Sequence, residues 1–192
     1  MISTKYGGFP VSVKIGLSFG PVDWEIIGAG KRKAYYFRGP AVEGCARAEH
    51  YAGKMHVVLD ADMKQNLDDS AEAEKIEEGF YLLREIKTKD SQHSDMKMIK
   101  MKKKIVSEFI PSRIIDHVQK REFRDVVSVF VRFKGLKSHE SINGYISDIL
   151  EKTDKYGGYF NHLDFGDKGS NFLVFFGAPL SYEDNLIRAC DY

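Results

Sequence analysis

The sequence predicts an α+β fold, with antiparallel sheets covered by helices on one face. Residues 11–19 alternate apolar and polar side chains, the period of a strand with one face in a core. Residues 142–150 repeat isoleucine, tyrosine and leucine at helical spacing, and residues 161–176 have the pattern of a hairpin with a Gly-Asp corner. This order of strand, helix and hairpin is what favours the α+β class.

The first half of the chain is expected to alternate short strands with two helical segments. We expect strands over 11–19, 24–27, 34–37, 55–59 and 79–86, a helix over 40–51 and a helical turn over 63–67. Pro40 suits the first turn of a helix, and Gly53 stands just past its expected end. Gly20-Pro21 breaks the first strand.

The second half begins with a weaker pattern. Residues 88–121 contain five lysines that crowd together over 97–104, which indicates either a docking or anionic-lipid patch or a solvated linker. A short helix is expected after Pro111, then a strand over 126–133, a helix that stops at Gly157-Gly158, the hairpin over 161–176, and a helix from Tyr182.

Composition excludes several function classes. The chain has 192 residues, of which 43% are hydrophobic and 30% charged, and a net charge of +1. That charge gives no field that favours nucleic acid or an acidic membrane as the main partner. Cys45 and Cys190 are too few for a disulfide framework, and neither a leader nor an apolar run of about 18 residues is seen. We therefore expect a cytoplasmic protein without a membrane span.

Three segments carry a resemblance to a known family. They are GGYFNHLDFGDKGSNFLVFFGAP at 157–179, RDVVSVFVRFKGL at 124–136, and VSVKIGLSFGPVDWEIIGAGKRKAYYFRGPAVEGCAR at 11–47. They resemble class III adenylate/guanylate cyclases, above all the tandem-domain soluble adenylate cyclases of the bicarbonate-regulated type and their bacterial relatives. The resemblance implies a ferredoxin-like cyclase fold.

The order of these segments is tail before head. The resemblance implies that residues 1–87 are the C-terminal part of a first cyclase-like domain, 88–121 a basic linker, and 122–192 the N-terminal part of a second. Because tail and head together supply one full set of strands and helices, we expect them to close into one circularly permuted fold, within one chain or by exchange between two.

The resemblance also implies a reaction for the parent protein, conversion of ATP to cyclic AMP and pyrophosphate in intracellular signalling. Two carboxylates of the family hold Mg²⁺ or Mn²⁺. Counted from Gly135, the first carboxylate position holds Arg132, a cation that cannot coordinate a metal, so this chain alone is expected to be inactive. Asp167 matches the family's Gly-Asp corner, although Ser170 stands at the expected spacing. Asp167 is either a metal ligand or a hairpin-corner residue.

The remaining site residues follow from the same resemblance. His162 stands at the purine-selecting position, or is an ordinary strand histidine. Arg47 stands where the family has a transition-state arginine, and Glu43 replaces an asparagine that positions the ribose. Since i, i+4 side chains are neighbours on a helix, we expect Glu43 and Arg47 to form an ion pair on a degenerate site.

Two classes of function stay open. One is an adenylate or guanylate cyclase piece, which needs complementary cyclase halves or a homo-oligomer. The other is a non-catalytic regulatory or assembly module of cyclase fold. In that module Arg132, Arg47 and Lys168 would either hold a nucleotide or a small anion such as bicarbonate, or serve as ordinary ion-pair partners.

Overall fold

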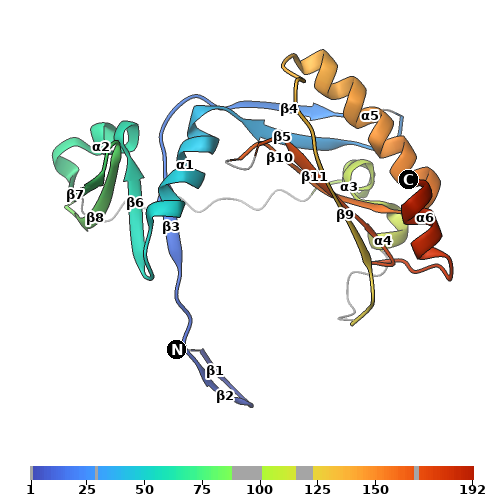
Figure 1. Cartoon of the computed structure of the whole chain (residues 1–192), viewed down its shortest axis with the longest axis horizontal. Coiled ribbons are helices and arrows are strands. Elements are labelled where there is room, and N and C mark those ends of the chain that lie inside the picture. The colour runs from blue at the N-terminus through green and yellow to red at the C-terminus, as the bar shows by residue number, and fades with distance from the viewer. Residues whose placement is uncertain (1, 29, 88–100, 116–122, 167–168) are drawn as a thin grey trace. The chain divides into compact units, whose positions relative to one another are not determined.

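The computed structural model describes residues 2–28, 30–87, 101–115, 123–166 and 169–192, and it confirms the α+β class (Figure 1). The chain forms two compact units, unit 1 with residues 1–23 and 38–95 and unit 2 with residues 24–37 and 96–192. This division differs from the predicted boundary at residue 87, because residues 24–37 group with the second half of the chain.

Unit 1 is built around a four-stranded sheet with the order β3-β6-β8-β7. Strands β3 and β6 are parallel and the other neighbours are antiparallel, so this sheet is mixed. The elements are β1 (Ile2–Thr4), β2 (Gly7–Phe9), β3 (Lys14–Leu17), α1 (Pro40–Tyr51), β6 (His56–Asp60), α2 (Ala61–Leu67), the 3-10 helix η1 (Asp68–Ser70), β7 (Ala71–Glu77) and β8 (Phe80–Ile86). Strands β1 and β2 pair separately as a hairpin.

Helix α1 packs closely across β3, and Gly16 permits that approach. A Cβ at Gly16 would lie 2.1 Å from the carbonyl oxygen of Cys45 and 2.3 Å from the backbone nitrogen of Glu49. The Lys14 Nζ lies 3.0 Å from Glu49 Oε1 on the same side of the strand. The small and polar side chains of β3 therefore face α1.

The apolar side chains of β3 consequently face away from α1. Ile15 is 41% exposed, and Val13, which directly precedes the strand, is 49% exposed. The expectation that the apolar face of residues 11–19 is buried in a core is therefore wrong for unit 1, where α1 selects the opposite face because only a glycine fits beneath it.

Unit 2 contains a three-stranded sheet and a separate strand pair. Its elements are β4 (Asp23–Ile27), β5 (Ala34–Arg38), α3 (Lys103–Phe109), α4 (Ser112–Ile115), β9 (Val127–Arg132), α5 (His139–Tyr156), β10 (Tyr159–Asp164), β11 (Asn171–Phe176) and α6 (Asn185–Asp191). The sheet order is β10-β11-β9, with β11 antiparallel to both neighbours. Strands β9 and β10, joined through α5, are thus parallel to each other with β11 inserted between them, a split β-α-β arrangement.

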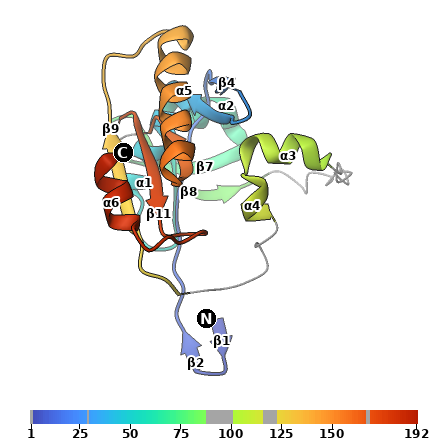
Figure 2. The same cartoon turned by 90° about the vertical axis from the view of Figure 1, so that its right-hand side faces the viewer.

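Helices α5 and α6 cover one face of this sheet and form the core of unit 2 with it (Figure 2). Ile142, Ile146, Val174 and Phe176 are fully buried there. Each such side chain stabilises the fold by roughly 1.5–3 kcal/mol relative to exposure. The strand pair β4–β5 contributes Ile27, Ala34 and Tyr36 to the same core.

The predicted stop of helix α5 is confirmed, and the structure also shows how the helix starts. Ser138 caps its start by accepting a hydrogen bond from the Ser141 N–H at 3.2 Å. Gly157 ends it with a φ of 74°, and the Gly158 N–H donates to the Thr153 carbonyl at 2.8 Å. This is the left-handed stop that a glycine adopts without steric cost.

Tail and head were expected to close into one circularly permuted fold within this chain, but their strands do not share a sheet. Strand β3 belongs to the sheet of unit 1, and β9 belongs to the sheet of unit 2. The piece of the tail that joins the head is the strand pair β4–β5, which enters as a second layer and not as an added strand. Exchange of strands between two chains stays a prediction.

Candidate ligand-binding face

The sheet of unit 2 has a second face, opposite α5 and α6, and two predicted site residues lie on it. In β9, Val127, Val129 and Val131 pack against the core, so the alternating Arg132 points to the opposite face and is exposed. In β10 a register shift between Phe160 and His162 leaves His162 exposed while Leu163 is buried. Arg132 pairs with Asn171 and His162 with Leu173, so β11 separates them.

Arg132 lies beside the corner of the β10–β11 hairpin. A Cβ at Gly169 would lie 3.3 Å from Arg132 Nη2. The hairpin is anchored by Asn171, which is 3% exposed and donates from Nδ2 to the Gly169 carbonyl at 2.9 Å. The structure therefore brings the strand end and the hairpin corner together. Asp167 and Lys168 lie outside the described residues.

His162 lines a cavity of about 300 Å³ within unit 2. Its walls come from three elements: β10 with its bulge, β5, and the C-terminal end of α3. Lys33, Tyr35, Phe109, Tyr159 and Asn161 lie around it. The Asn161 Nδ2 lies 2.7 Å from His162 Nδ1, so the imidazole is oriented by its neighbour in sequence. Aromatic walls with a few amide and imidazole groups suit a planar ligand.

Lys33, which precedes β5 and lines the cavity, makes two contacts with Glu108 of α3. The Lys33 N–H donates to the Glu108 carbonyl at 2.7 Å, and Lys33 Nζ lies 2.6 Å from Glu108 Oε2. The hydrogen bond from Lys33, together with its charge, lowers the pKa of the Glu108 carboxyl below its usual value. The Lys33 ammonium group is therefore held in an ion pair at the edge of the cavity.

Glu43 and Arg47 lie on helix α1 of unit 1, one turn apart and both exposed. Both residues are described, and the structure shows no ion pair between them, so the predicted pair is wrong. The spacing permits the contact, but for two long solvated side chains the entropy of holding one geometry offsets most of the Coulomb energy.

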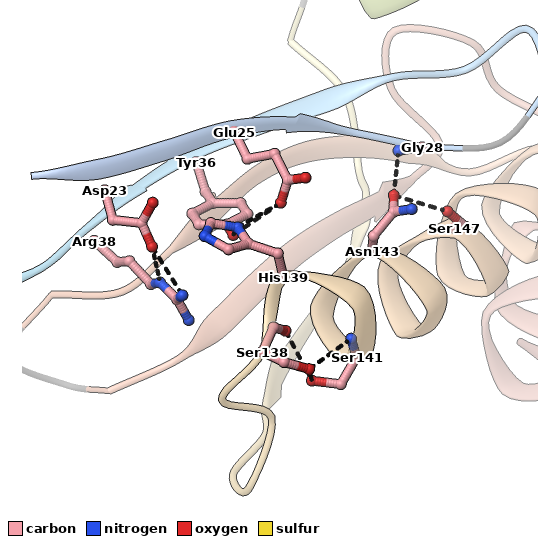
Figure 3. A network of polar contacts seen from close by, with 10 residues as sticks. All are labelled: Asp23, Glu25, Gly28, Tyr36, Arg38, Ser138, His139, Ser141, Asn143 and Ser147. Carbon is pink, nitrogen blue, oxygen red and sulfur yellow. Dashed lines mark hydrogen bonds and ion pairs between the residues drawn. The ribbon is translucent and has the colours of Figure 1, made fainter.

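A polar cluster that the sequence pattern does not indicate joins β4, β5 and α5 (Figure 3). Tyr36 Oη lies 2.7 Å from His139 Nδ1 and 3.2 Å from Glu25 Oε2, and His139 Nδ1 lies 2.7 Å from Glu25 Oε2. His139 is 103 residues from Tyr36 and 114 from Glu25, so no local spacing could reveal the contact. The only hint of this cluster in the sequence is that Tyr36 lies in an expected strand, where alternate side chains face the core.

The same strand pair is held at a second point. The Gly28 N–H donates to Asn143 Oδ1 at 3.0 Å, and the Ser147 hydroxyl lies 3.4 Å from that oxygen. One turn of α5 separates Asn143 from His139, so both anchors use the same side of the helix. The β4–β5 pair is therefore bonded to α5 as well as packed against it.

Within the residues that the structure describes, no three His, Cys, Asp or Glu side chains gather as a metal-binding group. Over the same residues, no helix combines the length and the apolar character that crossing a bilayer requires. No known protein family model and no curated protein sequence matches the chain.

Proposed function

We propose that this chain is part of a class III nucleotidyl cyclase, of the adenylate type, and that it supplies the non-catalytic half of the interface. The observation that carries the proposal is Arg132, which ends β9 beside the hairpin corner on the exposed face of the sheet. This is the place where the family resemblance positions a metal carboxylate. A guanidinium cannot ligate Mg²⁺ and repels it.

The topology of unit 2 supports the same proposal. Its order, β9-α5-β10-β11-α6 with β11 between β9 and β10, corresponds to the first five elements of the ferredoxin-like β-α-β-β-α-β pattern. The resemblance implies this pattern for a cyclase head. The described residues do not fit a two-metal centre, so no catalytic step is assigned to this chain.

The chain alone is expected to form no cyclic AMP or cyclic GMP above background with Mg²⁺ or Mn²⁺. The physical reason is that one of two required carboxylates is replaced by Arg132 and β9 carries no other acidic residue. Product formation is measured on folded protein, with ATP binding titrated calorimetrically on the same sample. Turnover that disappears in Asp167→Ala would contradict the proposal, because the metal site would then be present.

Placing a carboxylate at residue 132 tests whether this residue occupies the family's metal-ligand position. Arg132→Asp is expected to raise Mn²⁺ affinity at least about tenfold over the unchanged chain, since a carboxylate would then replace a repelling cation at the position where the resemblance places a metal ligand. The affinity is measured from the electron paramagnetic resonance of free Mn²⁺. The matched control is Lys152→Asp, which makes the same charge change on the exposed side of α5. An equal gain in both variants would mean a general charge effect and would contradict the assignment.

A second candidate function is a non-catalytic module that binds a nucleotide or a small anion such as bicarbonate. The cavity beside His162 favours it, because it offers aromatic walls and an exposed imidazole. Binding of ATP or bicarbonate without turnover, weakened in His162→Ala, would support this function over a purely structural role.

A further inference from the structure

The polar atoms of Glu25, Tyr36 and His139 converge on one another within unit 2. Their three polar atoms form a triangle with sides of 2.7, 2.7 and 3.2 Å. The side chains come from β4, β5 and the first residue of α5, all within unit 2. Figure 3 shows the three groups turned toward one another.

When the Glu25 carboxyl is ionised, the triangle has three contacts but at most two protons. The Tyr36 hydroxyl carries one proton, His139 Nδ1 carries one or none, and a carboxylate carries none. If Tyr36 donates to His139, the short contact between His139 and Glu25 sets two lone pairs against each other. If His139 donates, one proton is shared between two oxygens. Hydrogen bonds alone therefore satisfy the triangle only if the His139 proton is shared in a three-centre bond.

We propose that Glu25, Tyr36 and His139 form a divalent-metal site, with Zn²⁺ as the ion their chemistry fits best. An imidazole nitrogen and a carboxylate oxygen are ordinary Zn²⁺ ligands, and a phenolate oxygen is a comparable anionic donor. Tetrahedral ligands at about 2.0 Å from zinc lie about 3.3 Å apart. The observed triangle needs only to open slightly for a cation to accept one lone pair from each of the three atoms.

Access and charge agree with this assignment. The Glu25 side chain is 35% exposed and that of His139 45% exposed, which leaves an entry path and room for a water as fourth ligand. Tyr36 is 1% exposed and supplies a fixed donor from the core. The positive end of α5 carries about half an elementary charge and opposes a cation, but the full charge of Glu25 exceeds it.

A metal bound here would connect strands β4 and β5 to helix α5. Because the three ligands meet only in the folded unit, the ion binds the native state and raises its stability. Binding also displaces the Tyr36 proton, so it leaves a tyrosinate signal in the ultraviolet difference spectrum. These two readouts do not depend on any catalytic activity.

The test is calorimetric titration of the full chain with Zn²⁺, followed by Co²⁺ as a spectroscopic substitute. We expect Zn²⁺ affinity to fall at least tenfold in Glu25→Gln and Tyr36→Phe, and further in His139→Gln. Tyr36→Phe keeps the ring that packs 4.9 Å from Phe165, so the core is retained. The control is His50→Gln, an exposed histidine on α1, which should leave the affinity unchanged.

The outcomes separate clearly. A tyrosinate signal in the unchanged chain, lost in Tyr36→Phe, together with a raised melting temperature in Zn²⁺, supports the site. Absence of Zn²⁺ binding, or equal affinity in the unchanged chain and all three variants, overturns it. Zn²⁺ binding that survives Tyr36→Phe with no tyrosinate signal overturns the three-ligand assignment.

Discussion

Gly16→Ala is expected to destabilise unit 1 by about 3 kcal/mol or more, at the upper end of what overpacking costs. The added methyl would lie 2.1 Å from a backbone oxygen and 2.3 Å from a backbone nitrogen of α1, and neither can rotate away. Helix α1 would have to shift from β3. The measurement is amide hydrogen exchange of β3 and β6, supported by urea unfolding.

At a second glycine, the same substitution to alanine is expected to change stability in the opposite direction. Gly144 lies in α5, and a Cβ there meets no atom within 4 Å. Gly144→Ala should therefore stabilise the protein by up to about 1 kcal/mol through helix propensity. If Gly16→Ala were as harmless as Gly144→Ala, the close approach of α1 to β3 would be incorrect.

Ile27→Ala is expected to destabilise unit 2 by about 2–5 kcal/mol, the usual cost of emptying a core position. Ile27 is 2% exposed and belongs to the same core as Ile142 and Phe176. Trp24, the single tryptophan, lies on the same strand and reports its release by fluorescence during urea unfolding.

The neighbouring residue provides the control for this prediction. Ile26 is 49% exposed, so Ile26→Ala should change stability by no more than about 0.5 kcal/mol. Equal effects of the two substitutions would mean that strand β4 does not form part of the core of unit 2.

Local rules predicted those elements whose signals are local. Helix α1 begins at Pro40 and ends at Tyr51 as expected, because proline starts and an extended Ala52 ends it. The hairpin and the stop at Gly157 follow from turn chemistry that acts over a few residues. Strand β7 was not indicated, because it is a charged edge strand whose sequence, AEAEKIE, lacks apolar alternation.

The sequence did not predict which elements pack against one another. The alternation of β3 specifies two faces but not which of them a helix will cover, and Gly16 decides that only through the position of α1. At the candidate site, the exposed positions of Arg132 and His162 follow from strand period, but the cluster at Tyr36 depends on contacts more than 100 residues apart in sequence. Such contacts are set by packing, which a single sequence pattern does not encode.

Residues 24–37 come from the N-terminal half of the sequence but fold as part of unit 2. This arrangement makes the chain suitable for fragment complementation. The polypeptide passes between the units three times, at residues 23–24, 37–38 and 95–96. A fragment 96–192 would lack Ile27, Ala34 and Tyr36, and would present an unfilled core surface to solvent. A fragment 1–95 would carry an orphan hairpin. When the two fragments are produced together, burial of this core surface favours their association. Each fragment can therefore be used to capture the other.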